Sequence, residues 1–315
     1  MNIAARPLVI YHANCADGFT AAWAVHRRFD DRADYVAAMY DTTPPDVAGR
    51  DVIMVDFCYP PDVLRAMSLQ ARSILVLDHH KSAAADVPRE SRTGPAFLTC
   101  ERLDAPEWTM PRTWEHIQSC AEMDRCENIG RAIVYALFDM NRSGAGIAWD
   151  FFHPDTERPA LVNHVEDRDL WRFALPGSRE INAAIFSYPY VFGVWDALAE
   201  SSPRFLRLQG DAIERKQQKD IAELVRVCTR RLTIAGHDVP VASLPYTLTS
   251  DAGALMARGE PFAACYWDTA AGRTFSLRAE ARGLDVSLIA AQYGGGGHAK
   301  AAGFRVPRDH PLAMA

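Results

Sequence analysis

The sequence predicts an α/β fold, in which a doubly wound parallel sheet forms the N-terminal domain and a long helix leads to a smaller α/β C-terminal domain. Short apolar runs alternate with helical patterns in the N-terminal half, which is typical of a parallel sheet covered by helices on both faces. With 315 residues the chain is longer than one typical domain. Hydrophobic residues at 49% and charged residues at 23% are ordinary for a globular protein, so disorder is not expected.

Three apolar runs in this half are predicted to be buried strands, at residues 7–11, 51–57 and 73–80. A helix is expected after Gly18, because apolar residues recur there at helical spacing, and another is opened by the prolines at the start of 60–70. His12, Asp56 and the run Asp78–His80 stand where the predicted strands end. Ligands of open α/β sheets collect at that edge, so these side chains are expected to converge there.

Further along, residues 99–130 are predicted to be irregular and 131–140 to be helical, with a loop leading into another helix after them. Residues 203–230 carry one apolar stripe, which predicts a packed connecting helix. In the C-terminal part, strands are predicted at residues 232–235, 239–242, 262–267 and 275–277, and a helix is predicted near residues 284–293.

The charge and the cysteines narrow the class of protein. A formal net charge of −6 argues against a broad basic surface that coats long nucleic acid, but a small anionic substrate stays compatible because bound metal ions can reverse the sign of a pocket. The sequence has no apolar run long enough for a membrane span, and its N-terminus does not read as a signal peptide. Seven widely spaced cysteines suit reduced thiols, so a cytoplasmic location is expected.

Five motifs in order carry a specific resemblance. They are "HANCADGFTAA", "VDF" ending at Phe57, "DHH" at Asp78–His80, "VEDRDLW", and the glycine-rich "GGGGHAKAAGF", which "FSLRAE" precedes. The set resembles the DHH phosphoesterase superfamily with its DHH-associated C-terminal domain, and it extends from residue 12 to residue 304. A three-residue match such as DHH alone recurs by chance in unrelated sequences, whereas five motifs in the same order are specific for the family.

The resemblance implies an enzyme that hydrolyses phosphodiester bonds of short oligonucleotides or dinucleotides with metal-activated water, as exonucleases and nanoRNases do. The implied cofactor is Mn²⁺, with Mg²⁺ or another divalent metal as alternatives, and two ions are expected. The implied domains are a catalytic domain at 1–200 with an insertion near 99–130, a connecting helix at 201–230 and a substrate-binding domain at 231–315. The implied metal ligands are His12, Asp17, Asp56, His79 and Asp167.

Other residues follow from the same resemblance. Asp56 is expected to bridge the ions, Asp78 to orient the histidine pair, and His80 to contact the phosphate or to assist proton transfer. The residues expected to hold substrate are Ser143, Gly144, Arg278, Gly294, Gly295, Gly296, Gly297 and His298. For the fourth motif Asp167 is preferred to Asp169, whose carboxylate would then pair with a neighbouring arginine.

One position departs from the family pattern. Cys15 stands where the first of two aspartates is usual, with Asn14 beside it. Cysteine is a soft ligand, so it could favour another metal; alternatively it is a small buried thiol, and His12, Asp56 and water hold the first ion. Two other functions stay open: a phosphatase of bisphosphate nucleotides, and a degenerate sensor that binds nucleotide or nucleic acid without turnover, for which Cys15 and Asn14 are the sequence support. A homodimer is compatible with the sequence.

Overall fold

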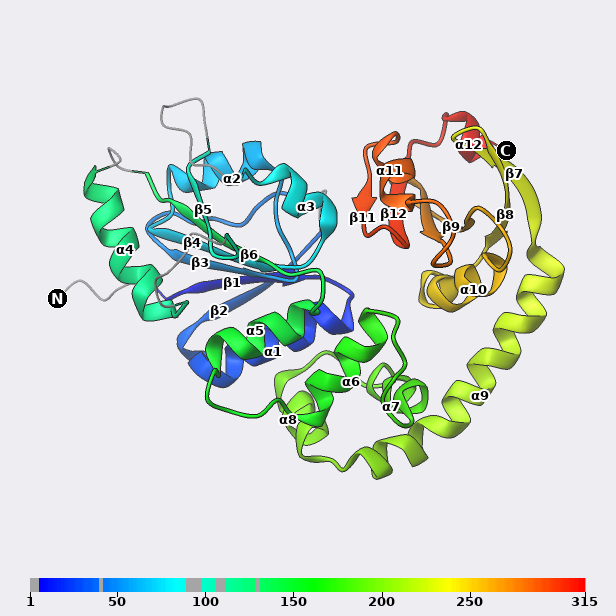
Figure 1. Ribbon diagram of the computed structural model, residues 1–315, viewed down its shortest axis with the longest axis horizontal. Helices are drawn as coiled ribbons and strands as arrows, with labels where there is room; N and C mark the ends of the chain where they lie inside the picture. Colours follow the sequence, from blue (N-terminus) through cyan, green and yellow to red (C-terminus); the bar gives the residue numbers. More distant parts are fainter. Residues whose placement is uncertain (1–5, 40–41, 89–97, 106–111, 128–130, 315) are drawn as a thin grey trace. The chain divides into compact units, whose positions relative to one another are not determined.

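The computed structural model describes residues 6–39, 42–88, 98–105, 112–127 and 131–314, with no side chains described over 124–127. The chain divides into two compact units, Met1–Asp211 and Ala212–Ala315 (Figure 1). Among the described residues, no hydrophobic cluster is shared between the units. Each unit therefore has a core of its own.

The first unit is built on a six-stranded sheet in the order β2-β1-β3-β4-β6-β5, and every neighbouring pair is parallel. This confirms the predicted doubly wound α/β fold. The three predicted strands are β1, β3 and β4. The strands are β1 (Leu8–His12), β2 (Asp34–Ala38), β3 (Asp51–Val55), β4 (Ser73–Asp78), β5 (Cys100–Arg102) and β6 (Val134–Phe138).

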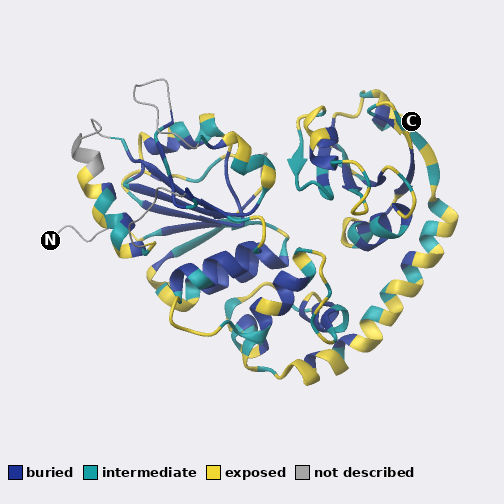
Figure 2. Cartoon of the chain, viewed as in Figure 1, coloured by how far each residue is buried: buried dark blue, intermediate teal, exposed yellow. Residues whose placement is uncertain are grey.

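Helices cover both faces of this sheet (Figure 1). On β3, Ile53 and Val55 point into one hydrophobic cluster, while Val52 and Met54 point into the other. The central strands are buried on both faces, which explains why they read as continuous apolar runs (Figure 2). The first face carries α1 (Ala16–Phe29), α4 (Trp114–Glu127) and α5 (Gly144–Phe152); the second carries α2 (Pro61–Ser68) and α3 (Lys81–Asp86).

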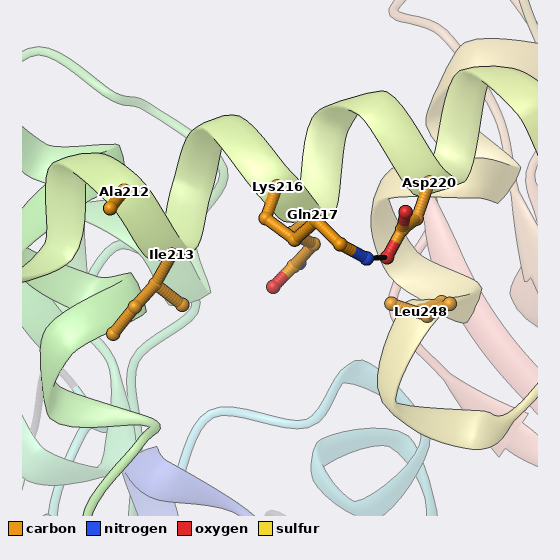
Figure 3. Close-up of a pocket in the computed structure, with 6 residues that line it drawn as sticks. All are labelled: Ala212, Ile213, Lys216, Gln217, Asp220 and Leu248. Carbon is orange, nitrogen blue, oxygen red and sulfur yellow. Dashed lines mark hydrogen bonds and ion pairs between the residues drawn. The ribbon is translucent and has the colours of Figure 1, made fainter.

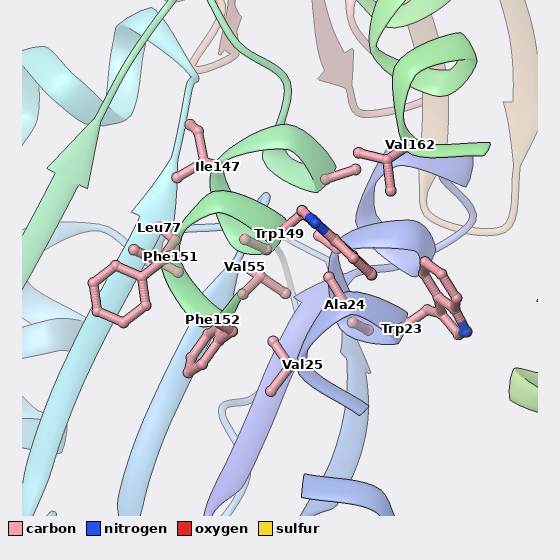
Figure 4. Packing of buried hydrophobic residues seen from close by; sticks show 14 of the residues in the cluster. Trp23, Ala24, Val25, Val55, Leu77, Ile147, Trp149, Phe151, Phe152 and Val162 are labelled. Atoms are coloured by element: carbon pink, nitrogen blue, oxygen red, sulfur yellow. The ribbon is translucent and has the colours of Figure 1, made fainter. Parts of the chain in front are cut away.

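Packing of α1 and α5 against the sheet positions the helix starts that matter for the site (Figure 4). Trp23 of α1 stacks on Trp149 of α5, with ring centroids 5.5 Å apart, and Val55 and Leu77 pack in the same cluster from β3 and β4. Full burial of such a side chain stabilises the fold by roughly 1.5–3 kcal/mol. The two helices are therefore held side by side, and both begin at the carboxyl edge of the sheet.

Two predictions for the middle of the chain are wrong. Residues 131–140 were expected to be helical, but they contain strand β6, whose side chains are buried on both faces between β4 and β5. An apolar run of that length has no periodicity that distinguishes strand from helix. Residues 99–130 are also not simply irregular, because β5 and α4 lie within them.

The first unit continues through three short helices into one long helix. These are α6 (Ala160–Asp169), α7 (Ser178–Ile185), α8 (Phe192–Glu200) and α9 (Pro203–Cys228), with a short 3₁₀ turn η1 (Asp30–Arg32) earlier in the chain. The predicted connecting helix is thus a helix, and the two units divide within it. The predicted stripe is packed only in part, since Ile221 is buried whereas Phe205 and Leu208 are exposed. No described helix has both the length and the apolar content that spanning a membrane requires.

The second unit is a mixed sheet in the order β11-β12-β10-β9-β8-β7, in which only β8 and β9 pair in parallel. α11 and α12 pack on one face, and α10 with the end of α9 packs on the other. Its elements are β7 (Arg230–Ile234), β8 (His237–Ser243), η2 (Tyr246–Leu248), α10 (Thr249–Met256), β9 (Ala263–Thr269), β10 (Gly272–Arg278), α11 (Val286–Ala291), β11 (Gly296–Gly297), β12 (Ala301–Val306) and α12 (Pro311–Met314).

A buried acid ties the start of β3 to its neighbours, and its removal should destabilise the first unit. Asp51 accepts hydrogen bonds from Ser73 (2.6 Å), Gln118 (2.9 Å) and Arg72 (2.8 Å), which lower its pKa although burial alone would raise it. We expect Asp51→Asn to reduce the free energy of unfolding by about 2 kcal/mol at neutral pH. Tryptophan fluorescence during urea unfolding measures this, because six of the seven tryptophans belong to the first unit.

The pH dependence of that loss has a definite sign. The pKa of Asp51 is lower in the folded state, so its contribution is complete above the unfolded value of about 3.9 and disappears as the pH falls through the folded value. The difference between wild type and variant should therefore shrink below about pH 4. Asp238→Asn is the control, since Asp238 pairs with Arg231 at the surface and should contribute under about 1 kcal/mol. Equal losses in the two variants would contradict this account.

Candidate metal centre

Histidine and acid side chains gather at the carboxyl edge of the first unit's sheet. His12 is the last residue of β1, Asp56 follows β3, and Asp78 ends β4 immediately before His79 and His80. Asp56 has a left-handed backbone, with φ of 53°, and its amide donates to a carbonyl of β4 at 2.9 Å. Aspartate tolerates this conformation better than most residues, so the turn after β3 can direct a carboxylate to this edge.

The first potential ligand group consists of Asp17, Asp56 and His79. One ligand atom from each lies within 4.8 Å of the others, and all three residues are at most 2% exposed. His79 Nε2 is 3.1 Å from Asp56 Oδ1 and 3.7 Å from Asp17 Oδ2. Three strong metal donors are thus held together away from water.

A second group consists of His12, Cys15 and Asp56, again with one ligand atom of each within 4.8 Å of the others. His12 Nδ1 lies 3.6 Å from Asp56 Oδ2. Burial, and then the charges of Asp56 and Asp169, raises the pKa of the Cys15 thiol well above its usual value. Asp56 belongs to both groups, and the Cys15 sulfur points toward the cluster.

The start of α5 holds the Asp17 carboxylate. The amide of Gly144 donates to Asp17 Oδ2 at 2.7 Å, and the amide of Ala145 donates to Oδ1 at 3.0 Å. Ser143 caps the same helix, because its Oγ accepts from Gly146 at 3.2 Å. Helix starts have unpaired N–H groups and a partial positive charge, and α5 has no acid in its own first turn. Asp17 of α1 therefore supplies the hydrogen-bond acceptors at the start of α5.

Two glycines allow the backbone to approach Asp56 closely. A Cβ added to Gly144 would overlap the Asp56 side chain, and one added to Gly18 would lie 3.1 Å from Asp56 Oδ2 and would overlap the His12 carbonyl. Neither glycine was singled out in the sequence as supporting the acids. A glycine inside a helix is unfavourable by roughly 1 kcal/mol relative to alanine. The presence of Gly18 in a predicted helix is therefore the sequence signal that the backbone has a close neighbour there.

Asp78 positions the histidine pair. Its Oδ1 accepts from the amides of His79 (2.8 Å) and His80 (3.3 Å) and lies 2.7 Å from His80 Nδ1. Burial alone would raise the pKa of Asp78, but the neighbouring histidines lower it, so the carboxylate stays charged. A charged Asp78 fixes the His80 ring with Nδ1 toward itself.

The acids of the cluster crowd one another. Burial, and then the charges of Asp56 and Asp169, raises the pKa of Asp17 well above its usual range. Burial would also raise the pKa of Asp56, but the nearby His12 and His79 bring it well below. Burial would lower the pKa of His79, yet the surrounding carboxylates raise it well above its usual value. The cluster therefore favours a positive charge, which a bound divalent metal ion would supply.

The donor chemistry of the cluster fits divalent metal ions. Carboxylate oxygens suit hard cations such as Mg²⁺ and Mn²⁺, and imidazole nitrogens favour Mn²⁺ and later metals. Asp56 belongs to more than one of these ligand groups, and a shared carboxylate is a feature of two-metal sites, whose ions lie roughly 3.5–4 Å apart.

The contacts of the two acids in the fourth motif favour Asp169, rather than the expected Asp167, as the residue that faces the cluster. Asp167 points away from the cluster and accepts from the amides of Ala174 (2.9 Å) and Leu175 (3.1 Å). Asp169, the last residue of α6, instead lies 3.6 Å from His79 Nε2. Residues two apart on a helix point in nearly opposite directions, so only one of the two acids can face the site.

Ser143 and Gly144, which were expected to line the substrate site, lie at the start of α5 beside the acids, where the Gly144 amide donates to Asp17 and Ser143 caps the helix. Ser143 is 0% exposed, which excludes surface contact by its side chain in this conformation. In the second unit, Arg278 donates to Ser250 Oγ at 2.7 Å and to the Leu277 carbonyl at 2.8 Å. The glycine run Gly294, Gly295, Gly296 and Gly297 and the turn at His298 lie next to Arg278 across β12, the strand that pairs with both β10 and β11.

A cavity of about 490 Å³ in the second unit contains no such cluster (Figure 3). It lies along α9, and Lys216 and Asp220 form an ion pair on its wall. The remaining lining residues are Ala212, Ile213, Gln217 and Leu248. Their amide and aliphatic side chains do not provide the donors that a metal requires.

Comparison with known proteins gives one relative by sequence and several by structure. No protein-family model matches the chain. An uncharacterized protein of Acanthamoeba polyphaga mimivirus, R106, is 24% identical over 326 residues; the match covers 94% of this chain, which spans 66% of the relative's length.

Among solved structures, the chain is similar to PggH, a pGpG-specific phosphodiesterase of Vibrio cholerae, with 14% identity, 96% and 93% of the two chains covered and a TM-score of 0.46. It is similar to RecJ of Thermus thermophilus, solved in complex with Mn²⁺, with 15% identity, 96% and 50% coverage and a TM-score of 0.47. It is also similar to an exopolyphosphatase-related protein of Bacteroides fragilis, with 10% identity, 98% and 89% coverage and a TM-score of 0.37.

A methyl group at Gly144 should disrupt the centre without unfolding the protein. Because a Cβ there would overlap Asp56, we expect Gly144→Ala to displace the Asp56 carboxylate and weaken Mn²⁺ binding. Calorimetric titration measures the binding, and thermal unfolding confirms the fold. Gly193→Ala is the matched control, since Gly193 also lies in a helix and its added Cβ would meet nothing within 4 Å. Unchanged Mn²⁺ affinity in a folded Gly144→Ala would refute the role of this glycine.

Variants of the two acids in the fourth motif should have different effects, one on metal binding and the other on the stability of the fold. We expect Asp169→Asn to weaken Mn²⁺ binding with little effect on stability, because its carboxylate faces His79. Asp167→Asn should instead lower the free energy of unfolding by about 1–3 kcal/mol and leave Mn²⁺ binding intact, since it removes charged hydrogen bonds to the α6–α7 loop. Each variant is the other's control, and the reverse pattern would restore Asp167 as the ligand.

Proposed function

We propose that this chain is a metal-dependent phosphoesterase of the DHH type, which hydrolyses phosphodiester bonds in short oligonucleotides or dinucleotides. The observation that carries the proposal is the buried group of Asp17, Asp56 and His79 at the carboxyl edge of a parallel sheet, where one shared carboxylate joins it to a second donor group. The five ordered sequence motifs support the same family.

The proposed roles follow from the contacts of each side chain. His12 and Asp56 would hold one ion, and Asp17, Asp56, His79 and Asp169 would hold the other. When bound, two divalent ions neutralise charge on phosphate oxygens and make water acidic enough to supply hydroxide near neutral pH. The helix start at α5 keeps Asp17 in place with two amides.

His80 is proposed to act on the leaving group. Asp78 lies 2.7 Å from His80 Nδ1 and thereby orients the ring, so Nε2 would be the nitrogen that gives a proton to the leaving oxygen. Burial would lower the pKa of His80, but Asp78 raises it, so the ring is suited to carry the proton that this step requires.

The second unit is proposed to bind the substrate through Arg278, the glycine run and His298. Backbone amides of glycines can approach phosphate closely because no side chain intervenes, and arginine recognises phosphate with paired N–H groups. A substrate with few phosphates needs few such contacts, in agreement with the net charge of −6. Preference for Mn²⁺, a cytoplasmic location and a homodimer stay predictions from the sequence.

A panel of substrates and metals tests the proposal. Metal-free protein receives dinucleotides, a cyclic dinucleotide, adenosine 3′,5′-bisphosphate or longer single strands, each with Mn²⁺, Mg²⁺, Zn²⁺ or no metal. We expect metal-dependent hydrolysis of dinucleotides, with rates that fall as the strand lengthens. Asp56→Asn should lower kcat by at least about 10²-fold, because both ions depend on this carboxylate.

Asp238→Asn controls for the change of an acid to an amide, since Asp238 is a surface residue remote from the cluster in sequence and in its contacts. Release of inorganic phosphate from the bisphosphate alone would favour a phosphatase. Binding of nucleotides without turnover under every metal would favour the sensor and contradict the proposal.

A further inference from the structure

Two of the donor groups that share Asp56 differ in one atom type. The group with Asp17 and His79 supplies oxygen and nitrogen, whereas the group with His12 and Cys15 also supplies sulfur. Asp56 contributes its carboxylate to both groups, so the two groups differ only in the other residues that surround Asp56.

A tight turn brings the sulfur to the cluster. β1 ends at His12, Asn14 adopts a left-handed backbone with φ of 55°, and Cys15 is the residue that precedes the first turn of α1. Its side chain makes no capping hydrogen bond to the helix. The Cys15 side chain is thereby placed at the start of α1, with its sulfur within ligand distance of His12 and Asp56.

Cys15 is also unlike the other cysteines. Of the six cysteines whose state the structure describes, Cys58, Cys100, Cys120, Cys228 and Cys265 belong to or pack against hydrophobic clusters, and Cys15 does not. Its neighbours are instead an imidazole and a carboxylate. A role as a packing thiol therefore explains the other cysteines better than it explains this one.

We propose that the two halves of the centre select different ions: His12, Cys15 and Asp56 take a thiophilic divalent ion such as Zn²⁺, and Asp17, Asp56 and His79 take a harder ion such as Mn²⁺. A thiolate prefers Zn²⁺ or Co²⁺ to Mn²⁺ and Mg²⁺, whereas the second group lacks sulfur. The thiol proton leaves to water when the sulfur binds. This inference rests on the metal centre of the proposed function, and it adds that the centre is heterometallic.

Cobalt reports on the sulfur directly. The full-length, metal-free protein is titrated with Co²⁺, for which a coordinated thiolate gives an intense near-ultraviolet charge-transfer band that oxygen and nitrogen ligands do not give. We expect the band in the wild type, and we expect Zn²⁺, but not Mg²⁺, to abolish it by displacement. Mn²⁺ added together with one equivalent of Zn²⁺ should bind as well, which electron paramagnetic resonance detects.

Variants identify the sulfur. Cys15→Ser should lose the band, and Cys15→Asp should lose it while gaining Mn²⁺ affinity at the same position. Cys120→Ser is the matched control, because Cys120 Sγ lies 3.3 Å from His116 Nε2 and is the other described cysteine that an imidazole contacts. That variant should keep the band.

The outcomes separate this inference from the proposed function. A wild type that binds Co²⁺ without the band, or a band that survives Cys15→Ser, overturns the thiolate ligand even if the protein hydrolyses dinucleotides. A band that depends on Cys15, in a protein that hydrolyses nothing in the panel, supports the mixed centre and contradicts the enzyme. Absence of the band from the wild-type spectrum overturns the thiolate ligand even where a variant fails to fold, and Cys15→Asp is the second variant that tests whether a band belongs to Cys15.

Discussion

The mutual repulsion of buried carboxylates is the constraint on which the rest of this structure depends. β1, β3 and β4 are parallel neighbours, so the polar residues at their ends meet at one edge. Asp56 and Asp17 are both almost fully buried there, and isolated buried charges are costly. The structure offsets the cost with His79 and with the amides at the start of α5. The remaining demand for positive charge is what suits the edge to cations.

Only part of the sheet could be predicted, because some of its strands have a clear local sequence signal and others do not. β1, β3 and β4 are short apolar runs followed by a polar residue, and helical patterns separate them. β6 was missed because it has the apolar content of a buried helix and no alternation. Its position between β4 and β5 depends on long-range pairing, which a local pattern does not record.

The candidate site was predictable where the chain direction alone decides the position. His12, Asp56 and His79 stand at strand ends, so topology brings them together whatever their side chains do. Asp167 and Asp169 belong to α6, where the rotation of the helix selects the acid, and sequence spacing does not give that rotation. The buried role of Ser143 was also beyond the sequence, because it depends on the start of α5 turning toward α1.

The hydrogen bonds between Asp17 and the first turn of α5 give this carboxylate a structural role in addition to its proposed role as a metal ligand. Its oxygens accept two backbone amides, so the docking of one helix against the other uses the same atoms that would bind an ion. A descendant that lost its chemistry could discard Asp169 or His12 at little structural cost, yet it would still need an acid at position 17. If inactive relatives keep an acid at position 17, the reason would be the packing of α1 against α5 rather than catalysis.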